Sequence, residues 1–278
     1  MTPIRPGDEF FIHVDDSHKR LYCTRPKISK SGAFQPCDMT PDDVDYEMSF
    51  YKDREVLQIN GMNQESFEHF VKHYAHSYRY LHFFHCQLIK DFSPLEDLRK
   101  LERVWISWNI RADKLWNMSK NESLNHIRII DCKKISLSPQ LLATSPTLEQ
   151  VGICGGTFNN FPIENLDIFG QIPNLRSLDL YMMKPLDKRL DFLANARKLE
   201  VFNFDAGMLT TEEIAWIVAK YPNLAGSCLG PYEGTIERKV DVRISGYRKP
   251  TLNLPEQQTR LEKYIAEFDA LVEKFKTQ

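Results

Sequence analysis

Apolar residues recur along the middle of the chain at intervals of three, two and three positions. The stretch NLRSLDLYMMKPL, residues 174–186, places leucine at 175, 178 and 180, and Met183 follows. Neither the 3.6-residue period of a helix nor the simple alternation of a strand produces this series. Two apolar residues separated by one other residue point to the same side of a strand. Each series therefore predicts a short strand followed by a turn.

The same series recurs every 23 to 27 residues. Clear copies are YRYLHFFHCQL, LERVWISWNIR, LNHIRIIDCKKI, LEQVGICGGTF and LEVFNFDAGML; REVLQINGM is weaker, and a degenerate copy begins at Leu224. The units start near residues 54, 78, 101, 124, 148, 175, 199 and 224. A period in this range is typical of stacked repeats, in which each unit buries its apolar side against its neighbours.

The series resembles the leucine-rich repeat, L-x-x-L-x-L-x-x-N/C-x-L, which has about 20–29 residues per unit. The resemblance covers residues 54–230. It implies an α/β solenoid, a horseshoe with a parallel inner sheet and outer helices, of the ribonuclease-inhibitor-like or cysteine-containing type. We expect an irregular spine, because the N/C position holds Cys86, Asn109, Cys132, Gly156, Met183 and Gly207.

The segments between the predicted strands favour helices on the outer side. Long helices are expected over 63–78 and 210–221, where Thr210 or Thr211 is a suitable N-cap with Glu213 in the first turn. Shorter helices are expected within 138–146 and 186–198.

Stacked repeats also need caps at both ends. We assign residues 1–53 to an N-terminal cap, with a hairpin from EFFIHV and RLYCTR and a polar loop or short helix over 37–50. Residues 54–230 form about eight repeats. Residues 231–278 form a C-terminal cap, with one or two strands before Pro250 and an amphipathic helix at its end.

Composition indicates a folded protein. The 278 residues are 42% hydrophobic and 27% charged, which allows a substantial core. With a net charge of -2, the chain has no bulk attraction for nucleic acid or anionic lipid. The sequence shows neither a secretory signal nor an apolar run of about 20 residues. We therefore expect a cytoplasmic protein that is monomeric by itself and acts away from membranes.

Two groups of side chains offer alternative chemistry. His69, His73 and His76 recur at helical spacing and suggest a zinc site. Cys154 and Cys228 are expected near the inner surface of the sheet, where an exposed thiol would be a nucleophile. No phosphate-binding loop, dinucleotide fingerprint or G-x-S-x-G motif occurs. We expect no catalytic residue, metal or cofactor; a metal-binding or enzymatic protein, and a ubiquitin-ligase adaptor acting through residues 1–53, stay open as alternatives.

The residues between the buried positions predict the chemistry of the inner sheet. Exposed aromatic and arginine side chains are typical of binding hot spots, and leucine-rich repeats commonly bind proteins on the concave sheet. We predict a non-catalytic module (adaptor, inhibitor or immunity-type) that binds a protein there, over a face that is aromatic and basic first and acidic later. The predicted partner-binding residues are Tyr80, His82, Phe84, Arg103, Trp105, Trp108, His126, Arg128, Asp131, Asp179, Tyr181, Asn203 and Asp205.

Overall fold

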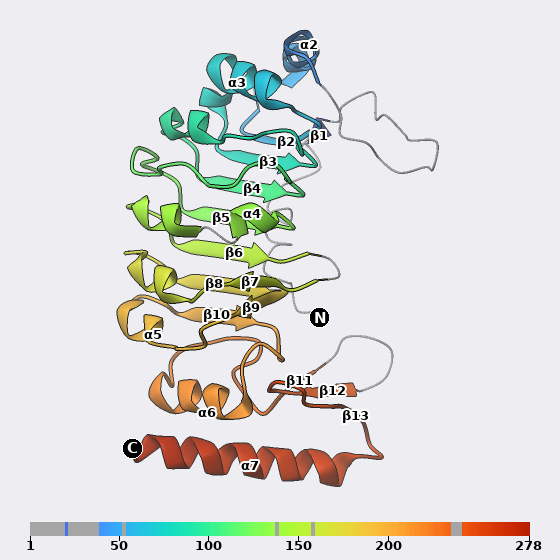
Figure 1. Cartoon of the computed structure of the whole chain (residues 1–278), viewed down its shortest axis with the longest axis vertical. Helices are drawn as coiled ribbons and strands as arrows, with labels where there is room; N and C mark the ends of the chain where they lie inside the picture. Colours follow the sequence, from blue (N-terminus) through green and yellow to red (C-terminus); the bar gives the residue numbers. More distant parts are fainter. Residues whose placement is uncertain (1–19, 22–38, 52–53, 137–138, 157–158, 235–240) are drawn as a thin grey trace.

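Eight parallel strands form one sheet along the length of the molecule (Figure 1). The computed structural model describes residues 20–21, 39–51, 54–136, 139–156, 159–234 and 241–278. In spatial order the strands are β1 (Arg20–Leu21), β2 (Val56–Asn60), β3 (Tyr80–Phe84), β4 (Arg103–Ser107), β5 (His126–Ile130), β6 (Gln150–Cys154), β8 (Ser177–Tyr181) and β10 (Val201–Phe204).

The strand register matches the repeat pattern. The first buried position of every unit from β2 to β10 lies in one row, and the second buried position lies in another. The first row is Leu57, Leu81, Val104, Ile127, Val151, Leu178 and Phe202, all within the core. Burial of a large apolar side chain contributes roughly 1.5–3 kcal/mol, so the repeated row stabilises each neighbouring pair. The chain has a leucine-rich-repeat-like α/β fold.

The ends of the sheet differ from the prediction of eight equivalent strands. Seven copies form strands, but the degenerate copy at Leu224 contributes only a parallel bridge between Val201 and Ala225. At the other edge, β1 pairs with β2 in parallel. EFFIHV, the other half of the predicted hairpin, lies outside the described residues. The segment predicted as a polar loop or short helix contains α2 (Pro41–Tyr51).

Each of the four outer segments predicted to be helical contains a helix, but only two of these helices are long. α3 (Gln64–His73) and α6 (Thr211–Lys220) are regular, and Thr210 and Glu213 form the expected capping box. Most other connections contain short pieces, namely η2 (Ser93–Asp97), α4 (Lys133–Ser136), η3 (Pro139–Thr144), η4 (Asp167–Gln171) and α5 (Phe192–Asn195). Pro94, Pro139 and Pro146 restrict long helices in two of these connections. The predicted curvature depended on wide outer helices, so the horseshoe shape stays a prediction.

The spine combines side-chain and backbone solutions. The buried Asn109 amide donates to the carbonyls of Cys86 and Ile89, at 2.8 and 2.9 Å, and its oxygen accepts from Ala112 N at 2.9 Å. Cys132 Sγ contacts the Ile130 carbonyl at 3.2 Å. Two later turns carry Gly156 and Met183, which lack such groups. There a second parallel pair, β7 (Phe161–Ile163) with β9 (Met183–Pro185), supplies backbone hydrogen bonds.

A small antiparallel sheet and a long helix follow the last repeat. β11 (Tyr232–Gly234), β12 (Asp241–Ile244) and β13 (Thr251–Asn253) form the sheet, with β13 beginning after Pro250. The amphipathic segment forms α7 (Gln258–Lys276), which packs along α6 at the end of the stack (Figure 1). Phe268 and Val272 of α7 join the main core beside Ile214 and Ile217 of α6.

Candidate functional site

The residues between the buried positions form a regular second surface, which we call the sheet face. Its middle row follows the strand register through Gln58, His82, Trp105, Arg128, Gly152, Asp179 and Asn203. Side chains two residues apart in a strand share one face. The rows beginning at Tyr80 and Phe84 therefore flank the middle row on the same face, and the register brings the predicted strand residues together.

The centre of the aromatic half is a buried stack. The His82 and Trp105 rings lie 4.4 Å apart at 17°, and the Arg128 guanidinium lies 5.4 Å from the Trp105 ring centroid. His82 Nε2 also hydrogen-bonds Ser107 Oγ at 3.0 Å. Trp105 is only 9% exposed and His82 only 3%. Both residues lie where the sequence predicts, but they support the sheet face more than they offer area for contact.

Two arginines lie near the Tyr80 ring, Arg103 in the first row of the face and Arg79 directly before β3. The guanidinium of Arg103 lies 5.2 Å from the Tyr80 ring centroid, and that of Arg79 lies 5.4 Å from it. Neighbouring His126 is half-buried. Its burial, followed by the charges of Arg103 and Arg128, lowers the pKa of His126 to about 3. His126 is therefore neutral near pH 7, and the positive charge of this region comes from arginine.

An accessible aromatic cluster lies at the carboxyl ends of β3 and β4. We define the aromatic cluster as Phe84, His85 and Trp108, which are all half-buried. The Trp108 ring centroid lies 4.8 Å from that of Phe84 and 4.2 Å from that of His85. Ile110, beyond Trp108 in the chain, is 53% exposed. This cluster combines a fixed geometry with area that a partner can cover.

The turn that presents the cluster has an unusual backbone. His85, Trp108, Asp131 and Met182 each follow a strand directly, and their φ angles lie between 51° and 54°. Such values are uncommon for residues other than glycine. The backbone amides of His85 and Trp108 donate to the last carbonyl of the next strand, at 3.1 and 2.9 Å. Repeated pairing thus holds the left-handed residue, and the side chain leaves the strand in a fixed direction.

Sequence reasoning included Trp108 and Asp131 but omitted His85. The signal was present, because His85 occupies the same position after β3 as Trp108 does after β4 and Asp131 does after β5. The half-buried Asp131 donates its amide to the Cys154 carbonyl at 3.0 Å.

The later half of the sheet face is a hydrogen-bonded polar surface. Asn203 Nδ2 donates to Asp179 Oδ1 at 2.7 Å, and Asn203 Oδ1 accepts from Ser227 N at 2.9 Å. Asp179 is 8% exposed and Asn203 is 7% exposed. Burial raises the pKa of Tyr181 to about 12 despite its hydrogen bond to Ser227. Asp179 and Asn203 therefore bond to each other, and Asn203 also bonds to the Ser227 backbone, which leaves few of their polar atoms free for a partner.

Asp205 takes part in the same series of hydrogen bonds at the turns that follow the strands. Its carboxylate accepts the Met182 amide, where earlier turns use a strand carbonyl. Burial raises the pKa of Asp205, although the Met182 amide and Arg243 act in the opposite direction.

The predicted histidine triad is wrong as a feature of one helix. α3 ends at His73 because Tyr74 leaves helical geometry, with φ -130° and ψ -34°, and His76 lies in η1 (Ala75–Ser77). His69 Nε2 instead lies 2.5 Å from Asp45 Oδ1. Within the described ranges, no three His, Cys, Asp or Glu side chains are placed to hold a metal ion.

The expectation of two exposed thiols is also wrong for Cys228. Cys228 is fully buried and donates to the Phe204 carbonyl at 2.9 Å, whereas Cys154 is half-buried. Burial raises the pKa of both thiols, so neither is activated as a thiolate. Cys86 and Cys132 are buried as predicted.

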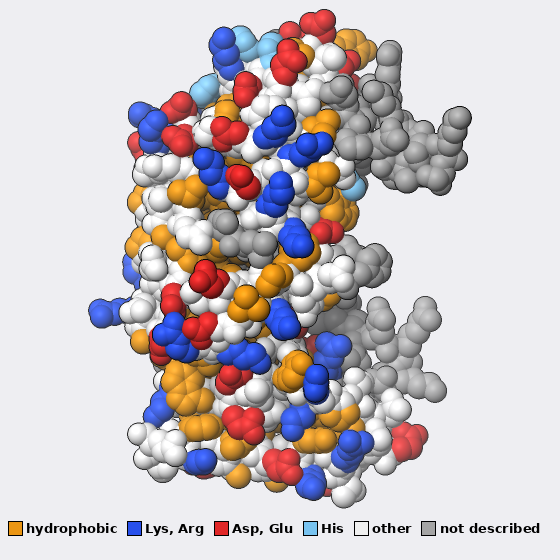
Figure 2. Space-filling view, in the orientation of Figure 1, with side chains coloured by type: hydrophobic (Ala, Val, Ile, Leu, Met, Phe, Trp, Pro, Cys, Tyr) orange, Lys and Arg blue, Asp and Glu red, His pale blue; other side chains and the backbone are white. Residues whose placement is uncertain are grey.

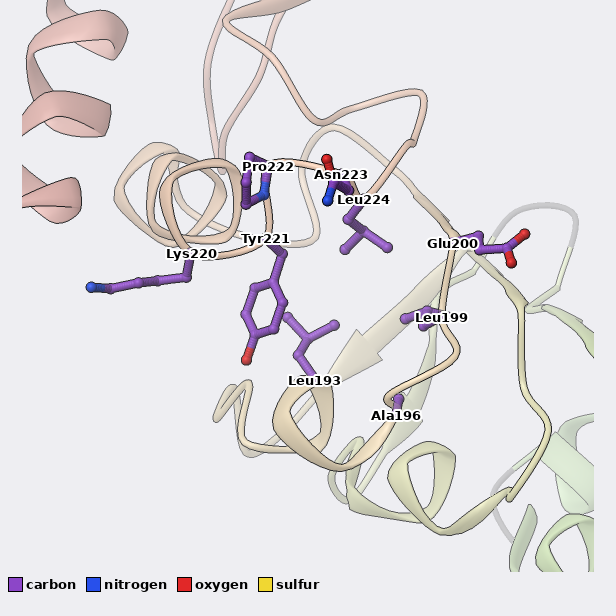
Figure 3. A pocket seen from close by; sticks show the side chains of 9 residues that line it. All are labelled: Leu193, Ala196, Leu199, Glu200, Lys220, Tyr221, Pro222, Asn223 and Leu224. Carbon is purple, nitrogen blue, oxygen red and sulfur yellow. The ribbon is translucent and has the colours of Figure 1, made fainter.

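A separate hollow of about 290 Å³ lies between α5 and the end of α6, away from the sheet face (Figure 3). The Tyr221 ring points toward Leu193, while Lys220 points away from the hollow. The nearby Glu200 pairs with Arg176 across neighbouring repeats. The hollow carries no convergent polar groups. In the described part of the chain, no helix has the length and apolar character needed to cross a membrane.

At the level of sequence, the chain matches no protein-family model and no curated protein. Two solved structures are similar in shape. One is a chain in the Toll–Spatzle complex from Drosophila, with 12% identity and a TM-score of 0.49, covering 60% of this chain and 22% of that chain. The other is an internalin from Listeria monocytogenes, with 15% identity and a TM-score of 0.34, covering 63% of this chain and 64% of that one.

Proposed function

We propose that this chain is a non-catalytic module that binds a protein partner on its sheet face, with the aromatic cluster as the anchor. The carrying observation is that Phe84, His85 and Trp108 are packed together yet half-exposed, at turns whose backbone is fixed by the next strand. Pre-ordered aromatic side chains lose little entropy when a partner covers them. Tyr80 and Arg103 extend the same face and supply polar and cationic contacts.

The charge along the face gives the partner an orientation. Arginines accompany the aromatic half, and Asp179 and Asp205 belong to the other half. A partner with an acidic patch beside an apolar one fits the first half best, because complementary charge guides encounter and register. The later half offers a partner less free polar area, because Asp179 and Asn203 are buried and bonded to each other.

The remaining expectations follow as proposals. An intracellular setting is supported by four free cysteines among the described residues. We also propose that the chain is monomeric and binds neither nucleic acid nor membranes. Its repeats are proposed to be of the ribonuclease-inhibitor-like or cysteine-containing type. A ligase-adaptor role through residues 1–53 stays a second proposal; most of that segment lies outside the described residues.

The test compares Trp108→Ala with Phe50→Ala, which removes a 62% exposed aromatic ring from α2. Proteins captured from source cells by the purified chain are identified, and the affinity of each is then measured with purified material. Loss of a central anchor costs about 2 kcal/mol, or roughly 30-fold in affinity. We expect that loss for Trp108→Ala and unchanged binding for Phe50→Ala. Equal affinity of both variants for every captured partner would refute the site.

A further inference from the structure

A second candidate site lies beside the turns that follow β8 and β10. It is a half-open groove of about 620 Å³ between β9 and β12. Five cationic side chains line it, and we call it the basic groove: Lys184, Lys188, Arg243, Arg248 and Lys249. In Figure 2, Lys and Arg side chains gather beside the part of the stack where Figure 1 places β9 and β12.

The cations reach the groove from two sides. Lys184 lies on β9 and Lys188 in the loop after it, whereas Arg243 lies on β12 and Arg248 and Lys249 in the following turn. Tyr247 is between the two sides, with Lys188 Nζ 5.1 Å and the Arg248 guanidinium 5.0 Å from its ring centroid. Like charges are thus held close together by elements about 60 residues apart in sequence.

The turn that carries Arg248 and Lys249 is fixed to the repeat stack. Gly246 N donates to the Ala206 carbonyl and Tyr247 N to the Leu209 carbonyl, both at 2.8 Å. Gly246 has φ +130°, and a Cβ there would lie 2.3 Å from Thr211 Oγ1. Only glycine fits this close approach without rearrangement. The turn is therefore a built feature that places its two cations before any ligand arrives.

The charge of the groove is not neutralised within the described residues. None of the five cations forms an ion pair with a described carboxylate, although other arginines of the chain pair with Glu102, Glu200 and Asp187. The lining includes one acidic residue, Asp205, whose carboxylate already accepts the Met182 amide. Keeping five like charges together beside a single described carboxylate costs free energy, which a bound anion would recover.

We propose that the basic groove binds a compact anion carrying two or more phosphate groups. Lysine and arginine form charge-assisted hydrogen bonds to phosphate oxygens, and one phosphate has too little charge to engage cations on both walls. Cations that converge around a hollow fit a compact polyanion better than an extended acidic peptide. This site shares only Asp205 with the residues assigned to partner binding, and none with the aromatic cluster.

The experiment uses the full chain and inorganic tripolyphosphate as the probe, followed by titration calorimetry. We expect saturable binding that weakens as salt is added. Lys188→Gln combined with Arg248→Gln should weaken it by at least about tenfold, since each loses a charge-assisted contact. Lys100→Gln with Arg111→Gln removes the same charge from exposed side chains elsewhere and should leave binding unchanged.

Two further variants sharpen the result. Lys188→Arg with Arg248→Lys keeps both charges and should retain binding within about threefold, whereas loss of a charge-assisted contact costs more. Asp205→Asn keeps an acceptor for the Met182 amide but removes the one carboxylate that the described residues contribute to the lining, so the affinity should rise. Thermal unfolding of each variant checks that the chain is folded.

A second binding experiment distinguishes phosphate on a lipid from free phosphate. Vesicles of phosphatidylcholine with and without a phosphorylated inositol lipid are compared with free tripolyphosphate. Binding to lipid-held phosphate, free phosphate or both supports the site if the double Gln variant loses it. Absence of both, equal loss in the Lys100/Arg111 control, or binding only to a polyglutamate peptide would overturn the proposal.

Discussion

Along β3, β4 and β5, the middle row of the sheet face consists of His82, Trp105 and Arg128, whereas along β6, β8 and β10 it consists of Gly152, Asp179 and Asn203. The backbone register is the same in both halves. The first half is held by ring stacking and a guanidinium over a ring; the second is held by hydrogen bonds. One scaffold thus supports two kinds of surface, because the backbone alone satisfies the strand pairing.

The boundary between the halves has a steric cause. A Cβ added to Gly152 would lie 3.3 Å from Arg128 Cγ, which is a tight contact. Glycine at this point gives the arginine room to lie against the face beside Trp105. The comparison predicts that the first half responds to loss of apolar area and the second to loss of hydrogen-bond partners.

The largest expected effect is in the aromatic half. Trp105→Ala removes a nearly buried ring that stacks on His82, so the free energy of unfolding should fall by about 3–5 kcal/mol. Urea unfolding monitored by circular dichroism measures it. Trp108→Ala removes a half-exposed ring and should cost only about 1 kcal/mol. Equal losses would show that Trp105 is not the supporting residue of the face.

The next largest effect is the pH dependence of stability in the aromatic half, which comes from His126. The pKa of His126 is lowered to about 3 in the folded chain, so the unfolded chain, with an ordinary pKa near 6.5, takes up the proton first as the pH falls. Stability is therefore complete above pH 6.5 and declines toward pH 3. Between pH 7 and pH 4.5 we expect a loss of about 2–3 kcal/mol from this group.

His126→Gln should remove that part of the decline in urea unfolding measured at the two pH values. His76→Gln, which changes an exposed side chain, serves as the matched control and should keep the full decline. An unchanged slope in His126→Gln would mean that His126 is not held neutral by its surroundings.

The smallest of these effects belongs to the polar half. Asn203→Ala removes the donor to Asp179 and the acceptor of the Ser227 amide, with an expected cost of about 1–2 kcal/mol. Hydrogen exchange of the Ser227 amide should accelerate along with the fall in stability. Gln150→Ala, an exposed position on β6, should change neither quantity. If Ser227 exchange is unaffected, the hydrogen bonds of Asn203 to Asp179 and Ser227 do not stabilise this half of the sheet face.

The periodic part of the fold was predictable, because buried residues such as Leu81 and Phe83 recur in two rows across the strands, and any slip in register would expose them. The outer layer was less predictable. Its segments lack a strong apolar period, and prolines such as Pro94 and Pro139 favour short turns over helices. Position on the sheet face was predictable for Trp105, but its burial was not, since this depends on the rings and guanidinium of neighbouring strands.

The basic groove left no signal in the repeat pattern. Lys184 and Arg248 lie in segments whose proximity is created only when the last small sheet folds back on the loop after β10. Sequence reasoning found His69, His73 and His76 instead because their spacing is local. The helix ends before Tyr74, so the helical spacing does not extend to His76.

The position of α7 has a consequence for chains that are cut short. α7 packs against α6, and Phe268 and Val272 belong to the same core cluster as Ile214 and Ile217 of α6. Removal of residues 258–276 by a protease would expose the apolar side of α6 and leave the earlier repeats in place. An exposed apolar patch of this kind favours association between molecules, so loss of α7 should make the chain prone to self-association.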